Sequence, residues 1–199
     1  VLSILLTTAQ VTGNNPNMPD RAIAETIDFG KSEQYTLSIR LSTDGFSFSI
    51  YNPIHDDSLS IIEKEINASS SLTANLKTLF HESDFLNHPY KRVNIMMAGK
   101  RFTIAPLELF EEEQAELLFY HNHQKKENET VLYNILRKNN VAVIFGIDKS
   151  AQTFLNEQYP EARFYSQSTP FIDYFSVKSR LGNSKKMYAS IRKDGIDIY

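Results

Sequence analysis

The sequence predicts an α/β protein whose mixed sheet opens with an antiparallel hairpin. Residues 35–51 read YTLSIRLSTDGFSFSIY, so that apolar and polar residues alternate on both sides of Asp44-Gly45. Alternation with a period of two is typical of a half-buried strand, and Asp-Gly tolerates the backbone of a tight hairpin turn. Helix and strand signals then follow in a mixed order, which indicates a mixed sheet covered by helices.

The hairpin pattern occurs a second time at the end of the chain. Residues 187–199 read MYASIRKDGIDIY, in which Ser190-Ile191-Arg192 matches Ser38-Ile39-Arg40 and Asp194-Gly195 matches Asp44-Gly45. We interpret the repeat as a duplicated, two-lobed architecture whose second lobe is incomplete in this chain. The predicted parts are an N-terminal extension (1–34), a first lobe with inserted strands (35–184) and the start of a second lobe (185–199).

Further elements follow from spacing and helix-terminus signals. Ser58 to Asn67 is either a third antiparallel strand or a short helix, and the strand is favoured because the helix lacks a cap. We expect helices that begin after Ser69-Ser70-Ser71 and at Asp148, both with capping side chains. The remaining expected strands span 93–98, 101–105, 131–137, 141–147 and 162–165.

Two more helices are expected from their terminal residues. Pro106 is suited to the first position of a helix whose buried side would carry Leu117, Leu118 and Tyr120. Thr169 is expected to cap a helix with Pro170 at its first position, which ends before Gly182.

Composition restricts the classes of function. The formal net charge is −3, so no global positive field favours nucleic acid or an anionic membrane. The chain has no cysteine, which excludes disulfides, thiolate metal sites and cysteine nucleophiles and is consistent with a cytoplasmic protein. No apolar run approaches the roughly 18 residues that span a bilayer. Since the chain lacks a starting Met and ends within a strand signal, we expect both ends to continue in a longer protein.

Several segments together resemble a known bacterial family. They read LSIRLSTDGFSFSIYNP, VNIMMAGKRFTIAPLELF, EEEQAELLFYHN, NVAVIFGID and FYSQSTPFIDYF. In these segments the chain is similar to the family catalogued as domain of unknown function 3822. That family typically reads Thr-aliphatic-Val-Pro where this chain has Thr103-Ile104-Ala105-Pro106.

The resemblance implies a fold similar to the actin-like ATPase domain, within the ribonuclease H-like group. Such a fold is a duplicated unit in which each lobe begins with an antiparallel hairpin, and the repeated hairpin is consistent with it. The family has no established activity, so the resemblance implies a fold and no reaction.

The resemblance also identifies four candidate nucleotide-binding residues: Asp44, Gly45, Asp194 and Gly195. In actin-like ATPases each hairpin turn holds phosphates through backbone N–H groups, and an Asp helps to hold Mg²⁺ or water. The usual pattern places Gly two positions after the Asp, whereas here Gly follows directly. This spacing suits a plain tight turn better than a phosphate-binding loop.

Other clusters have a functional and a structural interpretation. His121 and His123 could bind zinc, but residues two apart diverge at a helix end. His55-Asp56-Asp57 could bind a hard cation, although a polar loop is the commoner explanation. Lys91-Arg92 and Lys100-Arg101, with Tyr90 and Phe102, could form a small nucleic-acid platform or a charged sheet edge. The strand from Tyr35 to Leu41 has no carboxylate, which disfavours a ribonuclease H-type nuclease.

The sequence therefore favours a non-catalytic actin-like scaffold that binds an unidentified protein partner and needs no cofactor. The alternative is a nucleotide-binding protein or weak ATPase that uses ATP with Mg²⁺ at the two hairpin turns.

Overall fold

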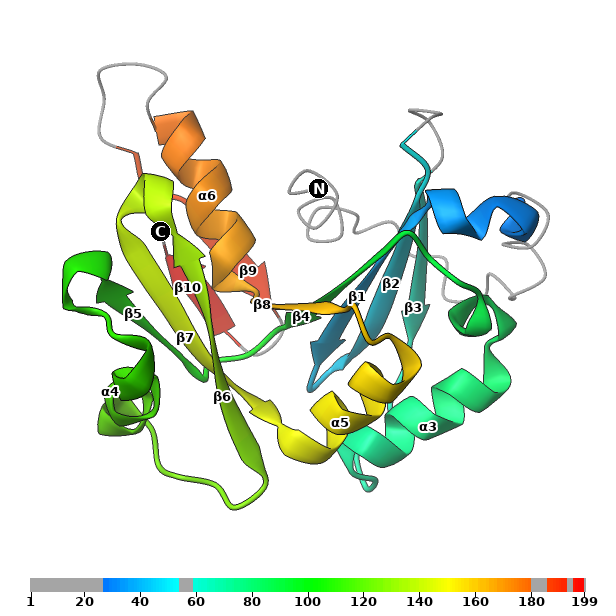
Figure 1. Ribbon diagram of the computed structural model, residues 1–199, viewed down its shortest axis with the longest axis horizontal. Helices are drawn as coiled ribbons and strands as arrows, with labels where there is room; N and C mark the ends of the chain where they lie inside the picture. Colours follow the sequence, from blue (N-terminus) through cyan, green and yellow to red (C-terminus); the bar gives the residue numbers. More distant parts are fainter. Residues whose placement is uncertain (1–26, 54–58, 180–185, 193–194, 199) are drawn as a thin grey trace.

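The computed structural model describes residues 27–53, 59–179, 186–192 and 195–198. They form a five-stranded sheet with two helices on one face, a three-stranded sheet beside it, and a separate two-stranded hairpin (Figure 1). The first sheet contains β1 (Thr36–Ser42), β2 (Gly45–Tyr51), β3 (Leu59–Lys64), β4 (Arg92–Met97) and β8 (Arg163–Ser166). The other two contain β5 (Phe102–Pro106), β6 (Glu129–Leu136) and β7 (Val141–Asp148), then β9 (Ala189–Arg192) and β10 (Gly195–Ile198).

The five-stranded sheet has the order β3-β2-β1-β4-β8. β1, β2 and β3 form an antiparallel meander, and β4 and β8 continue it parallel to β1. The predicted hairpin at the start of a mixed sheet is confirmed, and so is the third antiparallel strand. β1 thus pairs antiparallel with β2 on one side and parallel with β4 on the other.

Two helices cover one face of this sheet, α3 (Leu72–Glu82) and α5 (Lys149–Gln158). Each begins at a capping side chain that the sequence predicted. Ser71 Oγ accepts from the backbone N–H of Ala74 at 3.1 Å, and Asp148 Oδ1 accepts from that of Ala151 at 2.8 Å. The core that they enclose includes Leu37, Ile39, Leu41, Phe46, Phe48, Ile50, Leu76, Leu79, Phe80, Val93, Ile95, Ala151 and Leu155.

The opposite face of the same strands is polar although it is buried. Ser49, Ser38 and Asn94 are directly paired across β2, β1 and β4, and each is at most 3% exposed. Their hydroxyl and amide atoms have no hydrogen-bond partner among the described residues. The strict polar and apolar alternation of β1 therefore separates two buried faces and does not separate core from solvent.

The three-stranded sheet is antiparallel, with the order β5-β7-β6, and α4 (Ala115–Asn122) packs on one of its faces. Ala115 and Phe119 of α4 contact Ala105 and Ile144 in a second, smaller core. β4 and β5 are consecutive in sequence but belong to different sheets. The strands between β4 and α5 thus form a sheet of their own.

Three details of the predicted helices were wrong. Pro106 ends β5 and does not open a helix, because its backbone is extended; α4 begins at Ala115 after a 3-10 turn at Glu112–Gln114. Leu117 is 70% exposed, because the sheet-facing positions of α4 are taken by Ala115 and Phe119. The last helix, α6 (Ser168–Ser179), begins before Thr169, whose hydroxyl bonds to β6 and does not cap the helix. Gly182 lies outside the described residues.

Candidate functional site

The carboxyl ends of β1, β4 and β8 lie side by side along one edge of the five-stranded sheet. The backbone N–H of Ala98 donates to Leu41 O at 2.8 Å, and that of Gln167 donates to Met97 O at 2.9 Å. Open α/β sheets bind ligands outside the carboxyl ends of their strands, where the strand order reverses. The β1–β2 turn and the start of α6 at Ser168 therefore border the most suitable edge of this sheet for a ligand.

The β1–β2 turn contains the first candidate pair, Asp44 and Gly45. Ser42 and Gly45 are the closing pair of the hairpin, with two residues between them. Ser42 Oγ is hydrogen-bonded to the carboxylate of Asp44, and the backbone N–H of Asp44 lies 3.3 Å from that same hydroxyl. Arg40 Nη1 lies 4.0 Å from Asp44 Oδ1. The carboxylate and the amide of Asp44 thus stabilise the turn itself.

Gly45 is required by the backbone of this turn. Its φ is +147°, and a Cβ atom at this position would lie 3.0 Å from Lys64 O. We expect Gly45→Ala to lower the free energy of unfolding by about 1–3 kcal/mol, because side chains rarely adopt this conformation. Urea unfolding measures the change. Gly99→Ala is the control, since no atom lies within 4 Å of a Cβ there; equal stability of the two variants would contradict the structural role of Gly45.

The second candidate pair is only partly described. Gly195 begins β10 and pairs with Arg192, so the second hairpin also closes across two residues. Asp194 lies outside the described residues. The roles of Asp44, Gly45, Asp194 and Gly195 in nucleotide binding stay predictions.

The junction between β8 and α6 has a hydrogen-bond network that the sequence did not reveal. Asn134 of β6 donates through Nδ2 to Phe164 O at 2.9 Å, and its Oδ1 accepts from the backbone N–H of Ser166 at 3.0 Å. The same Oδ1 accepts from Thr169 Oγ1 at 2.7 Å. The Asn134 amide pairs with the outer edge of β8 as a neighbouring strand would, and it joins the two sheets.

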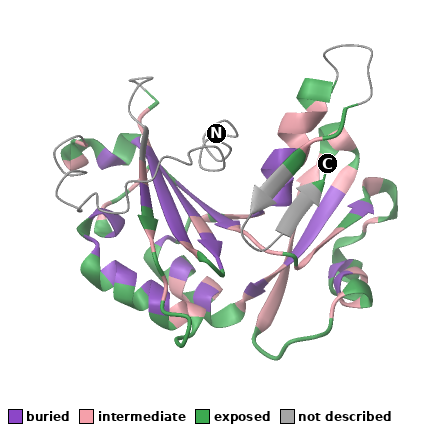
Figure 2. Cartoon of the chain, turned by 180° about the vertical axis from the view of Figure 1, so that it is seen from behind, coloured by how far each residue is buried: buried purple, intermediate pink, exposed green. Residues whose placement is uncertain are grey.

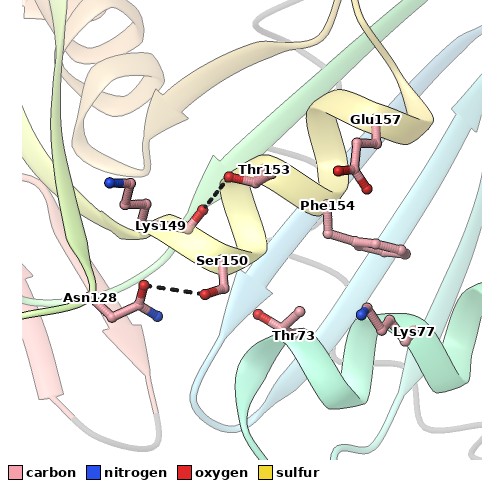
Figure 3. Close-up of a pocket in the computed structure, with 8 residues that line it drawn as sticks. All are labelled: Thr73, Lys77, Asn128, Lys149, Ser150, Thr153, Phe154 and Glu157. Atoms are coloured by element: carbon pink, nitrogen blue, oxygen red, sulfur yellow. Dashed lines mark hydrogen bonds between the residues drawn. The ribbon is translucent and has the colours of Figure 1, made fainter.

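A shallow hollow of about 320 Å³ lies between α3, the start of α5 and the loop before β6 (Figure 3). Two of its hydroxyl groups are bonded to other lining residues: Ser150 Oγ donates to Asn128 Oδ1 at 3.2 Å, and Thr153 Oγ1 donates to Lys149 O at 3.0 Å. Asp148 beneath it caps α5 and accepts from Asn128 Nδ2 at 2.8 Å. These contacts hold the start of α5 in place. The lining residues are Thr73, Lys77, Asn128, Lys149, Ser150, Thr153, Phe154 and Glu157.

The residues of the possible nucleic-acid platform are spread over both ends of β4. Lys91 and Arg92 lie at the start of β4, and Lys100 and Arg101 follow its end, about 20 Å away along a strand of this length. Arg101 Nη2 lies 2.6 Å from Glu129 Oε2, and the hydrogen bond with Glu129 raises the pKa of Arg101. Tyr90 Oη donates to Phe85 O at 2.6 Å. Arg101 and Tyr90 therefore stabilise the fold.

The histidine clusters give no metal site in the part of the chain that the structure describes. His123 Nε2 lies 3.1 Å from Phe102 O at the end of α4, while His121 is exposed. His55, Asp56 and Asp57 lie outside the described residues. Among the described side chains, no three of His, Cys, Asp or Glu gather closely enough to hold a metal ion.

The helices described are also too short or too polar to cross a bilayer.

Comparison with known proteins identifies the family. The family model described as protein of unknown function DUF3822 matches residues 24–199. The chain belongs to this family. No curated protein matches the chain. Membership in DUF3822 confirms the resemblance seen in the sequence.

A solved relative supports the same assignment. The crystal structure of a protein from Bacteroides thetaiotaomicron VPI-5482, described as having an actin-like ATPase fold and unknown function, is 81% identical to this chain. The two superpose with a TM-score of 0.84, over 87% of this chain and 67% of that one. The mixed α/β architecture of this DUF3822 chain thus agrees with a neighbour whose fold is actin-like, and neither comparison names an activity.

Proposed function

We propose that this protein is a non-catalytic actin-like scaffold for protein interaction. The supporting observation is the β1–β2 turn, in which the Asp44 carboxylate and backbone N–H both bond to the hydroxyl of Ser42. A phosphate-binding loop needs backbone N–H groups that point toward the ligand, and an acid that is available to Mg²⁺ or water. A turn in which Oδ1 and the backbone N–H of the Asp are bonded to a Ser of the same hairpin is better suited to closing that hairpin.

The proposal includes a duplicated, ribonuclease H-like architecture. In its support, the antiparallel β3-β2-β1 meander is followed by parallel β4 and β8, with helices between. The hairpin of β9 and β10 closes across two residues, as β1 and β2 do. On this proposal residues 35–184 form the first lobe with its inserted sheet, residues 185–199 begin a second, and 1–34 precede both. A cytoplasmic location is part of the same proposal.

Thermal unfolding in the presence of Mg²⁺-ATP tests the proposed function. A ligand at 100 times its Kd stabilises the native state by about 2.7 kcal/mol, which is readily seen as a higher Tm. We expect millimolar Mg²⁺-ATP to leave the Tm of the wild type and of Asp44→Ala unchanged relative to Mg²⁺ alone. A nucleotide-dependent increase that Asp44→Ala abolishes would establish the alternative, a nucleotide site at the hairpin turn.

A further inference from the structure

Two leucines that follow β5 are exposed without any role in the core. Leu109 and Leu117 are each 70% exposed, among the most exposed large apolar side chains that the structure describes. Within α4 the sheet-facing positions belong to Ala115 and Phe119, which are at most 6% exposed. The fold thus needs no large apolar side chain at position 117, and an exposed leucine there contributes nothing to the packing of α4.

The same segment is acidic and lacks basic residues. No Lys or Arg occurs between Arg101 and Lys125. Five glutamates in this segment are exposed: Glu108, Glu111, Glu112, Glu113 and Glu116. Like charges this dense repel anionic lipid surfaces and nucleic acid and attract cationic polypeptides. The electrostatic complement of this surface is therefore a basic protein segment.

Exposed charge and exposed apolar side chains occur together between Leu109 and Leu117. Leu109 ends a 3-10 turn, Leu107–Leu109, Glu113 lies in the next 3-10 turn, and Glu116 and Leu117 lie in the first turn of α4. Figure 2 shows exposed turns of this helix on the outside of the three-stranded sheet. We call Leu109, Glu113, Glu116 and Leu117 the Glu/Leu surface.

The outer edge of the neighbouring strand β5 is only partly available for strand addition. Gly146 N donates to Arg101 O and Leu107 N to Asn140 O, so Phe102, Ile104 and Pro106 direct their backbone groups away from β7. Of these, the carbonyl of Phe102 is bonded to His123, and Pro106 has no N–H. A partner at this side of the molecule is therefore recognised mainly through side chains, which favours a helical over an extended segment.

We propose that the Glu/Leu surface binds a basic amphipathic helix of a partner protein, one that presents apolar side chains flanked by Lys and Arg. The inference rests on the proposed scaffold function and names its binding surface and its class of partner. The apolar side chains of the partner cover Leu109 and Leu117, and its cations lie against Glu113 and Glu116. Because the contact is partly electrostatic, salt weakens it.

Fluorescence anisotropy with a labelled amphipathic Lys/Leu peptide tests this assignment. We expect saturable binding to the wild-type chain that weakens about tenfold or more in Leu109→Ser/Leu117→Ser and in Glu113→Lys/Glu116→Lys. Glu33→Lys/Glu82→Lys changes two exposed glutamates elsewhere and should bind as the wild type does. An oligolysine of equal charge should bind more weakly, because it cannot cover the leucines. Circular dichroism establishes that each variant is folded.

Two outcomes would overturn the assignment: absence of peptide binding to the wild type, or binding that the two Glu/Leu-surface variants do not weaken. Binding of oligolysine as tight as that of the Lys/Leu peptide would also overturn it, since the leucines would then be irrelevant. Thermal unfolding with Mg²⁺-ATP separates this inference from the proposed function. If nucleotide raises the Tm, the scaffold proposal fails whatever the peptide does; if neither ligand binds, only the Glu/Leu surface fails.

Discussion

Replacing Asn134 by alanine is expected to lower the free energy of unfolding by about 2–4 kcal/mol. The substitution removes both hydrogen bonds that the side chain makes with the edge of β8, and the one with Thr169. It leaves the backbone N–H of Ser166, a residue that is 2% exposed, without its partner. Urea unfolding followed by far-UV circular dichroism measures the loss.

Two further variants make the Asn134 prediction specific. Asn134→Asp keeps an acceptor for Ser166 and Thr169 but sets a carboxylate oxygen against Phe164 O, so it should also destabilise. Asn122→Ala removes only bonds of 3.4 Å at an exposed site and should change stability by less than about 0.5 kcal/mol. If Asn134→Ala were no less stable than Asn122→Ala, the two sheets would not depend on this amide.

Gly146→Ala is expected to destabilise the chain by about 2–3 kcal/mol. A Cβ atom at this position would lie 2.4 Å from Glu129 Oε1 and 3.0 Å from Phe119 Cζ. Neither group can move freely. Glu129 is 6% exposed and forms a two-point ion pair with Arg101, whose guanidinium also lies 5.4 Å from the centre of the Phe119 ring. The new methyl group must therefore break the ion pair or displace the ring.

The matched control for Gly146→Ala is Gly99→Ala, which meets no atom within 4 Å. Thermal unfolding of the two variants in parallel measures the difference. We expect Gly99→Ala to melt within a degree or two of the wild type and Gly146→Ala several degrees lower. Equal melting temperatures would show that Glu129 and Phe119 adjust at little cost.

Local signals predicted most elements of the fold. Ser71 and Asp148 were recognised as caps because a capping bond joins residues three apart in sequence, and both bonds are present. The hairpin of β1 and β2 was likewise set by a two-residue turn. Elements that depend on nearby residues are thus the ones that the sequence specified.

Features that depend on distant contacts were missed. The sequence predicted that Leu117 is buried. The α4 residue that packs against Ile144 of the three-stranded sheet is instead Phe119. Asn134 interrupts the apolar residues Leu132 to Ile135, and this single polar residue in a strand was the only signal of its bonds 30 to 35 positions away. Periodicity identifies a face but not the element that covers it.

Only the local features of the candidate site were predictable from the sequence. Asp44 and Gly45 were recognised as a turn, and the structure adds that the Ser42 hydroxyl bonds to Oδ1 and to the backbone N–H of Asp44. The basic residues around β4 had two interpretations, a nucleic-acid platform or a charged sheet edge, and neither included the bond of Arg101 to Glu129, 28 positions away. Ser42 and Asp44 are two positions apart within one turn. The pairing of Arg101 with Glu129 has no local signature, because its partners lie far apart in the sequence.

Isothermal titration of the chain with Mg²⁺-ATP tests most directly whether this DUF3822 protein acts without nucleotide. We predict only heat of dilution, for the wild type and for Asp44→Ala alike. A saturable, Mg²⁺-dependent heat in the wild type that Asp44→Ala removes would contradict it and make the β1–β2 turn a working phosphate site.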